Sequence, residues 1–182
     1  MADCKIAETP MSAIETLKVE DGGLSADATR YRRVIGKLQY LSFTRPDICF
    51  SVNKLSQFMQ TPSETHWKVV KWELRYLQGT VHFGLRLMSR NSLSLHVYSD
   101  ADWAGDASDR ASTTSYLLFL GKNPMTWSSK NQRTIAHSST EAEYREVASS
   151  FAETNWVTNL LAEPQLKLHS VPTIYRYNVG AT

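Results

Sequence analysis

The chain has 182 residues and a formal net charge of +2, with 42% hydrophobic and 21% charged residues. This composition supplies enough apolar side chains for a buried core and excludes a disordered, collagen-like or low-complexity chain. The two cysteines, Cys4 and Cys49, lie in no CxxC or Cys/His cluster, which excludes a disulfide scaffold and argues against structural zinc. No apolar run approaches the roughly 20 residues of a membrane span, and residues 1–18 lack the pattern of a signal peptide. We therefore expect an intracellular protein, in the cytoplasm or the nucleus, with reduced thiols and no membrane partner.

The charged residues are unevenly distributed along the chain. Residues 30–90 carry eleven Lys and Arg against three Asp and Glu, whereas residues 91–182 carry seven against nine. A basic segment beside a mildly acidic one is typical of a polyanion-binding surface next to a carboxylate site. Within the basic segment, Lys68, Lys71 and Arg75 share a helical face and are predicted to contact phosphate groups. A solvated helix face explains these residues equally well, so both interpretations stand at this point.

The first half of the chain predicts a lead-in followed by a small helical unit. Residues 1–29 are expected to be irregular, because polar and turn-forming residues interrupt any periodicity. Residues 30–80 show apolar residues at helical spacing in three stretches. Pro46 favours a helix start, Ser63 is a candidate N-cap, and Gly79 is a natural helix end. The sequence therefore predicts two or three helices in this region.

From about residue 82 the apolar pattern changes to a period of two. Strands are predicted at His82–Met88, Leu93–Ser99, Ser115–Leu120, Met125–Ser128 and Val171–Tyr177. Before the last of these, a long helix is predicted from Ser138 or Ser139 up to Pro164, with acidic residues in its first turn. Residues from Tyr144 to Leu160, including Phe151 and Trp156, recur along it at helical spacing. The interpretation is an α/β domain with a mixed sheet over residues 81–182, and its order is taken as β-β-β-α-β, which counts one strand fewer than these five stretches.

Two acidic motifs are the sharpest chemical features of this second domain. Asp100 and Asp102 follow an apolar strand and precede a turn, and Glu141 and Glu143 lie in the first turns of the long helix. Carboxylates from a strand end and a helix start can converge on a hard cation such as Mg²⁺. Acids are also common in turns and at helix N-termini for capping and dipole reasons. From spacing alone, a cation site and a purely local structural role both remain open.

Several segments in the right order resemble one known family. Residues 31–80 (YRRVIGKLQYLSFTRPDICFSVNKLSQFMQTPSETHWKVVKWELRYLQGT) resemble the region that joins reverse transcriptase to ribonuclease H in Ty1/copia-type retrotransposon Pol polyproteins. Four further segments are similar to the ribonuclease H signatures of that family: YSDADWAG (98–105), DRASTTSY (109–116), TWSSKNQ (126–132) and SSTEAEY (138–144). The resemblance covers almost the whole chain, which is identified as a fragment of such a polyprotein.

The resemblance implies a ribonuclease H-like fold and a carboxylate site for two Mg²⁺ ions. In that family the ions support cleavage of the RNA strand of an RNA–DNA hybrid. Asp100 matches the first acid, at the end of the first strand, and Glu143 matches the second, near the start of the long helix. Glu141 lies two positions earlier, about 200° around the helix, so it is expected to point elsewhere. Asp102 lies on the same side as Asp100 if the strand continues, and is a candidate to support the cation site.

The chain departs from the family pattern at the third acid. Tyr177 stands where an aspartate is expected, and Arg176 replaces a small neutral residue. A phenol with a pKa near ~10 stays neutral at pH 7 and is a poor Mg²⁺ ligand. The family's fourth acid lies in a later helix, which the chain does not reach before Thr182, so a domain lacking its C-terminal part is expected. The resemblance thus implies a ribonuclease H-like domain whose catalysis and magnesium binding are impaired.

Two alternatives to an impaired ribonuclease H remain open. One is a non-catalytic module that binds RNA–DNA hybrid, other nucleic acid or other polyprotein segments through its basic helices. The other is a pseudogene-like product without a role. Glu73 stands where related sequences usually have isoleucine, next to Trp72 and Leu74, and is expected to bring a charge to the packed face of its helix. Such departures are typical of a decayed copy, although variation within a large family explains them too.

Overall fold

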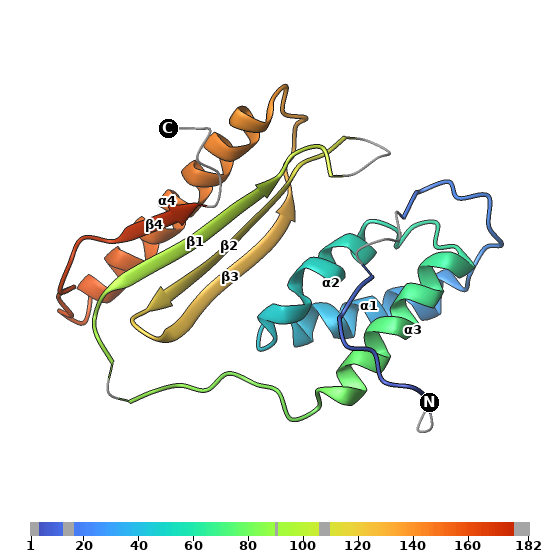
Figure 1. Ribbon diagram of the computed structural model, residues 1–182, viewed down its shortest axis with the longest axis horizontal. Coiled ribbons are helices and arrows are strands. Elements are labelled where there is room, and N and C mark those ends of the chain that lie inside the picture. Colours follow the sequence, from blue (N-terminus) through green and yellow to red (C-terminus); the bar gives the residue numbers. More distant parts are fainter. Residues whose placement is uncertain (1–3, 13–16, 90, 106–109, 177–182) are drawn as a thin grey trace. The chain divides into compact units, whose positions relative to one another are not determined.

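The chain folds into two units (Figure 1). The structure is a computed structural model that describes residues 4–12, 17–89, 91–105 and 110–176. The first unit spans Met1–Leu85 and the second spans Arg86–Thr182, so the division falls a few residues after the predicted boundary at 80 and 81. No helix among the described residues is both long and apolar enough to cross a lipid bilayer.

The first unit is helical. It contains α1 (Ala28–Leu41), the short 3₁₀ turn η1 (Pro46–Ile48), α2 (Cys49–Ser56) and α3 (Glu64–Gly79). Pro46 opens η1, because its fixed φ suits a helix start and its missing N–H would have had no partner there. Among the described residues before α1, the backbone forms no helix or strand apart from one isolated bridge to the start of α3.

Side-chain caps fix where the two longer helices begin. The Asp27 carboxylate accepts hydrogen bonds from the backbone N–H groups of Thr29 and Arg30, at 2.9 and 3.0 Å. At α3 the Ser63 hydroxyl accepts from the N–H of His66 at 3.3 Å, and the His66 ring accepts from the N–H of Ser63 at 3.0 Å. These reciprocal bonds satisfy donors that a helix start otherwise leaves unpaired, and each such cap contributes about 1 kcal/mol.

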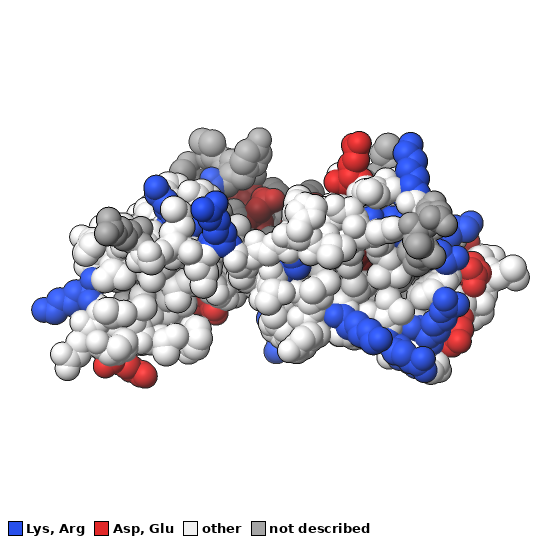
Figure 2. All heavy atoms as spheres, turned by 90° about the horizontal axis from the view of Figure 1, so that it is seen from below, with Lys and Arg blue, Asp and Glu red and all other residues white. Residues whose placement is uncertain are grey.

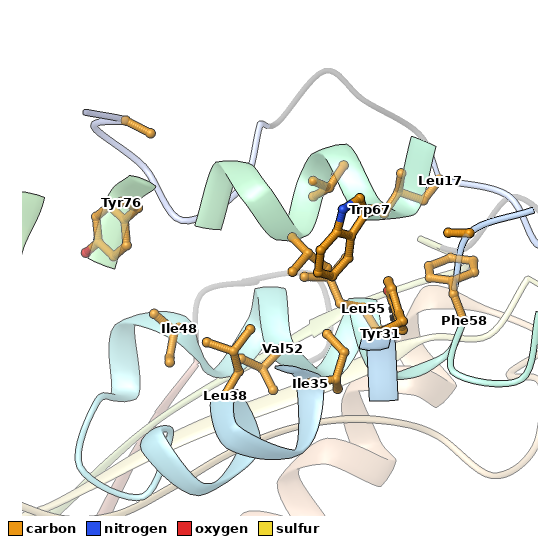
Figure 3. Packing of buried hydrophobic residues seen from close by; sticks show 14 residues of the cluster. Leu17, Tyr31, Ile35, Leu38, Ile48, Val52, Leu55, Phe58, Trp67 and Tyr76 are labelled. Carbon is orange, nitrogen blue, oxygen red and sulfur yellow. Dashed lines mark hydrogen bonds between the residues drawn. The ribbon is translucent and has the colours of Figure 1, made fainter. Parts of the chain in front are cut away.

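One apolar core holds the three helices together (Figure 3). The Tyr31 hydroxyl donates to the carbonyl of Leu55 at 2.9 Å, so this buried ring brings no unsatisfied polar group with it. The lead-in packs against the same core through Ala7 and Leu17, although it is irregular. The labelled residues of the core come from the lead-in, from every helix of the unit and from the turn after α2: Leu17, Tyr31, Ile35, Leu38, Ile48, Val52, Leu55, Phe58, Trp67 and Tyr76.

A buried arginine ties η1 to the end of α3. The Arg45 guanidinium donates to both carboxylate oxygens of Asp47, at 2.8 and 2.6 Å, and to the carbonyl and hydroxyl of Thr80, at 3.0 and 2.8 Å. Burial alone raises the pKa of Asp47, but the hydrogen bonds from Arg45 and Tyr76 hold it below its ordinary value. The Arg45 guanidinium is therefore paired with the Asp47 carboxylate and hydrogen-bonded to Thr80 at this junction.

The second unit is a four-stranded mixed sheet with one long helix. Its strands are β1 (Leu95–Asp102), β2 (Thr113–Leu120), β3 (Asn123–Asn131) and β4 (Thr173–Arg176), in the spatial order β3-β2-β1-β4. The β1–β2 and β2–β3 pairs are antiparallel, and β4 runs parallel to β1. With α4 (Ser139–Ala162) between β3 and β4, the order is β-β-β-α-β. This confirms the predicted α/β class and is consistent with a ribonuclease H-like fold.

The strand predicted at His82–Met88 is wrong. Those residues form no strand and are exposed. Their alternating pattern is a local signal, and a strand also needs a neighbour with which to exchange backbone hydrogen bonds. The first strand of the unit is instead β1, which begins two residues after the predicted Leu93 and continues to Asp102.

The long helix α4 packs its more polar side on the sheet. Its buried residues include Glu143, Glu146, Ser150 and Thr154, and only toward its C-terminal half do Val157 and Leu161 supply apolar contact with the sheet. The large apolar residues Tyr144, Phe151, Trp156 and Leu160 are exposed. The apolar spacing therefore predicted the helix, and the helix buries a different side.

We predict that Gly121→Ala destabilises the second unit by about 1–3 kcal/mol. Gly121 lies in the turn between β2 and β3 with a φ of +57°, and an added Cβ would lie 2.6 Å from the backbone oxygen of Ser92. The measurement is urea unfolding followed by circular dichroism. Lys122→Ala, one residue further along the same turn, is the control and should change stability by less than ~0.5 kcal/mol. Equal effects of the two substitutions would contradict the prediction.

Candidate active site

Strand β1 divides its side chains between two faces of the sheet. Val97 and Ser99 are buried, on the side that α4 covers, whereas Tyr98, Asp100 and Asp102 are exposed. Successive side chains of a strand point to opposite faces, which explains this alternation. Because β1 runs on through Asp102, the condition for Asp100 and Asp102 to lie on the same side is met.

Two acids of α4 are buried against the sheet. The Ser138 hydroxyl caps the helix by accepting from the N–H of Glu141 at 3.1 Å. One turn later come Glu143, which is 9% exposed, and Glu146, which is 2% exposed. Carboxylates are costly to bury in their charged form, so their surroundings decide their chemistry.

The surroundings of Glu146 connect three elements of the unit. Burial raises its pKa above the ordinary value, hydrogen bonding with the Ser150 and Ser99 side chains opposes this, the negative charge of Asp100 raises it further, and the positive charge of Arg176 lowers it. The Ser150 hydroxyl donates directly to the Glu146 carboxylate. Asp100 on β1, Arg176 on β4 and Glu146 on α4 are therefore close enough to interact through their charges.

Glu141 and Asp102 take part in local structure. The Glu141 carboxylate accepts from the N–H of His137 at 2.7 Å and pairs with Arg145 at 2.5 Å, and the bond from His137 is the main reason why its pKa lies below the ordinary value. The Asp102 carboxylate lies over Gly105, where an added Cβ would come within 2.0 Å of an Asp102 oxygen. Glu141 thus stabilises the start of α4, and Asp102 lies at the end of β1 beside Gly105.

The structure does not bring the two main predicted acids, Asp100 and Glu143, onto one face. Glu143 lies on the buried side of α4, as does Glu146, whereas alternation directs Asp100 toward the face of β1 that α4 does not cover. A shared cation site at Asp100 and Glu143 stays a prediction, and Tyr177 lies outside the described residues. The sequence reasoning overlooked Glu146, although its spacing of three residues from Glu143 was a signal that both acids share a helix face.

The described acids do not fit a pair of Mg²⁺ ions. Within the described ranges, no three or more His, Cys, Asp or Glu side chains are grouped so that they could hold a metal ion. Magnesium requires several oxygen ligands in near-octahedral arrangement, and two dications require charge compensation as well. The side chain of Arg176 instead brings a positive charge to within range of Glu146.

The predicted basic face lies on α3. Lys68 and Lys71 are exposed, and the Arg75 guanidinium lies over the ring of Trp72, with its central carbon 5.0 Å from the ring centroid. The Trp72 indole N–H donates to the carbonyl of Thr9 at 2.8 Å, which holds this ring in place. In the space-filling view, Lys and Arg side chains gather along one edge of the helical unit (Figure 2).

Comparison with known proteins identifies the family. The chain is 49% identical over 182 residues to the retrovirus-related Pol polyprotein from transposon RE2 of Arabidopsis thaliana, and 50% identical over 182 residues to that from transposon RE1 of the same plant. It is 37% identical over 177 residues to the corresponding polyprotein from transposon TNT 1-94 of Nicotiana tabacum. The chain belongs to the copia-type Pol polyproteins. No family model and no solved structure matches it.

The match covers all of this copia-type chain but little of its relatives. The 182 aligned residues make up 12% of the RE1 and RE2 polyproteins, and the aligned part makes up 13% of the TNT 1-94 polyprotein. The chain thus corresponds to one segment of a much longer polyprotein. The resemblance inferred from the sequence motifs is confirmed at the level of the family.

We predict that Asp100→Asn lowers the pKa of Glu146 and that Arg176→Gln raises it. The first change removes a negative charge that disfavours ionisation of Glu146, and the second removes a positive charge that favours it. The measurement is an NMR titration of the side-chain carboxyl carbon of Glu146 in the copia-type chain. Asp102→Asn, on the same face of β1 but without an effect on Glu146, is the control. An unchanged Glu146 titration in Asp100→Asn would contradict the arrangement.

Proposed function

We propose that the second unit is a ribonuclease H-like domain that engages RNA–DNA hybrids as part of a copia-type polyprotein, and that this copy cleaves them poorly or not at all. One observation supports the assignment above all. The charge of Asp100, near the end of the central strand β1, acts on Glu146, which lies one turn from Glu143 on the buried side of the long helix that packs on this strand. The order β-β-β-α-β, with β4 parallel to β1, agrees with that family's expected fold.

The weakness of cleavage follows from charge and ligand chemistry. Family members are expected to hold two Mg²⁺ ions with carboxylates, and here position 177 is a tyrosine. A neutral phenol neither offsets the charge of a dication nor replaces a carboxylate oxygen as its ligand. Arg176, in the strand next to β1, adds a fixed positive charge near Glu146 that disfavours a cation at the same place.

A hybrid-cleavage assay tests this proposal. The full chain is incubated with Mg²⁺ and a hybrid whose RNA strand is end-labelled, beside the Asp100→Asn variant. We expect no more RNA cleavage from the chain than from the variant, because the carboxylate set is incomplete. Cleavage that depends on Mg²⁺ and that Asp100→Asn abolishes would show that the site is functional and would overturn the claim of a defective copy.

A gain-of-ligand variant provides the complementary prediction. Arg176→Cys combined with Tyr177→Asp restores the expected carboxylate and removes the competing positive charge. We expect the double variant to bind Mg²⁺ at least about tenfold more tightly than the original chain, as measured by isothermal titration calorimetry. Arg176→Cys alone is the control, since it removes the charge without adding a ligand. No gain over that control would contradict the assignment of position 177 to the cation site.

A second function, hybrid binding without cleavage, is favoured by the basic face of α3. Lys68 and Lys71 are exposed on one side of this helix, and the Arg75 guanidinium stacks on the ring of Trp72. A row of cations at helical spacing suits the phosphates of a nucleic-acid backbone, which are recognised without regard to sequence. On this proposal the helical unit supplies affinity and the sheet unit supplies the remnant of the catalytic site.

We predict that replacing Lys68, Lys71 and Arg75 by glutamine weakens hybrid binding and lowers the slope of log affinity against log salt by roughly 2–3. Each lost phosphate contact releases about one fewer counterion, which sets that magnitude. The measurement is fluorescence anisotropy of a labelled hybrid at several salt concentrations. The control replaces three scattered exposed lysines, Lys5, Lys18 and Lys167, so that the net charge is matched. An equal loss in both variants would reduce the effect to overall charge and contradict a specific face.

A further inference from the structure

Glu73 is a carboxyl group sealed inside the core of the helical unit. It lies on α3 and is 0% exposed. One of its oxygens is 2.7 Å from the hydroxyl of Ser51 on α2, and its Oε2 is buried without a hydrogen-bond partner. A polar atom left in this state destabilises the fold, and more so when it is charged than when it is neutral.

Two acceptors compete for the proton of the Ser51 hydroxyl. The Ser51 oxygen lies 2.7 Å from Glu73 and also 2.9 Å from the carbonyl of Ile48, and a hydroxyl has one proton to donate. An ionised Glu73 can only accept, so it competes with Ile48 for that proton. A protonated Glu73 can donate to the Ser51 oxygen while Ser51 donates to Ile48, and the chain of hydrogen bonds is then complete.

The charges around Glu73 also oppose its ionisation. Asp47 on η1 and Tyr31 on α1 are the titratable groups that interact with it from the neighbouring elements, and neither supplies a positive charge. The nearby guanidinium of Arg45 is directed to Asp47 and Thr80. Among the described residues, no Lys or Arg forms an ion pair with Glu73. Burial in the first place, and then the charge of Asp47, raise the pKa of Glu73 to about 7, while the hydrogen bond from Ser51 lowers it.

We propose that Glu73 is a proton-dependent clamp between α3 and α2, which closes the helical unit when the carboxyl is protonated and loosens it when the carboxyl is ionised. The clamp rests on the sealed position of the carboxyl, its single hydroxyl partner and the absence of a compensating cation among the described residues. It does not depend on nuclease activity or on nucleic-acid binding by either unit. Its ligand is the proton alone.

The direction of the pH effect follows from linkage. A group whose pKa is higher in the folded than in the unfolded state keeps the folded state favoured at low pH and loses that advantage as the pH rises. For Glu73 the contribution is complete below the ordinary value of 4.5 and is lost on passing through about 7. The separation of the two values corresponds to a change on the order of a hundred-fold in the unfolding equilibrium constant of the helical unit.

The test compares the full chain with Glu73→Gln between pH 4.5 and pH 8.5. Glutamine is neutral and of the same shape, and its amide can donate to Ser51 as the protonated acid does. We expect similar stability of the two proteins at pH 4.5, and a variant that is more stable by on the order of a hundred-fold in the unfolding equilibrium constant at pH 8.5. Urea unfolding gives the equilibrium constants, and hydrogen exchange of the α2 and α3 amides assigns the change to these helices.

Controls separate the clamp from other titrating groups. His66 is also buried, with a pKa lowered by that burial, and it contributes equally to both proteins, so it cancels in their difference. Glu64→Gln changes an exposed glutamate at the start of the same helix and should leave the pH profile as it is. If Glu73→Gln does not fold, Glu73→Ile serves as the second neutral variant. A stability difference between the original chain and its neutral variant that stays constant from pH 4.5 to pH 8.5 would overturn the proposal.

Discussion

The contact between α4 and the central strand β1 is the constraint on which the second unit depends. Helices usually bury an apolar stripe on a sheet, yet α4 places Glu143, Glu146, Ser150 and Thr154 there and leaves large apolar side chains such as Phe151 exposed. Burying carboxylates costs free energy that a structure must offset with hydrogen bonds or opposite charge. The hydroxyl of Ser150 and the charge of Arg176 provide such an offset for Glu146. A hydrogen bond and an opposite charge from the unit's own residues thus stabilise this polar interface.

The sequence predicted those features that depend on short stretches of chain. Pro46, Ser63 and Ser138 each mark a helix start through a local steric or hydrogen-bonding preference, and the structure confirms all three. Features that depend on distant partners were harder. The alternating pattern of His82–Met88 is a sound local signal without a neighbouring strand, so it produced a wrong prediction. The buried side of α4 could not be recognised from apolar spacing, because that side is polar near its N-terminal end.

The candidate site shows the same limit in its chemistry. Motif position indicated Asp100 and Glu143 correctly as residues of a strand end and a helix start, but it could not indicate the direction of their side chains. That direction depends on strand alternation, which separates Asp100 from its buried neighbour Ser99. Glu146 was overlooked because an acid in a helix is usually a solvated residue, and only the packing of α4 shows that this one is enclosed.

The two buried glutamates illustrate how similar residues acquire different roles from their partners. Glu146 has two hydroxyl partners and the positive charge of Arg176 beside the negative charge of Asp100, so the unit contains part of what its ionised form requires. Glu73 has one hydroxyl, a negative neighbour in Asp47, and a nearby arginine already committed elsewhere. A carboxylic acid in an apolar core without a nearby cation has its lowest free energy when it remains protonated. A chain that has a glutamate at such a position therefore gains a dependence of its stability on pH as a direct consequence of its packing.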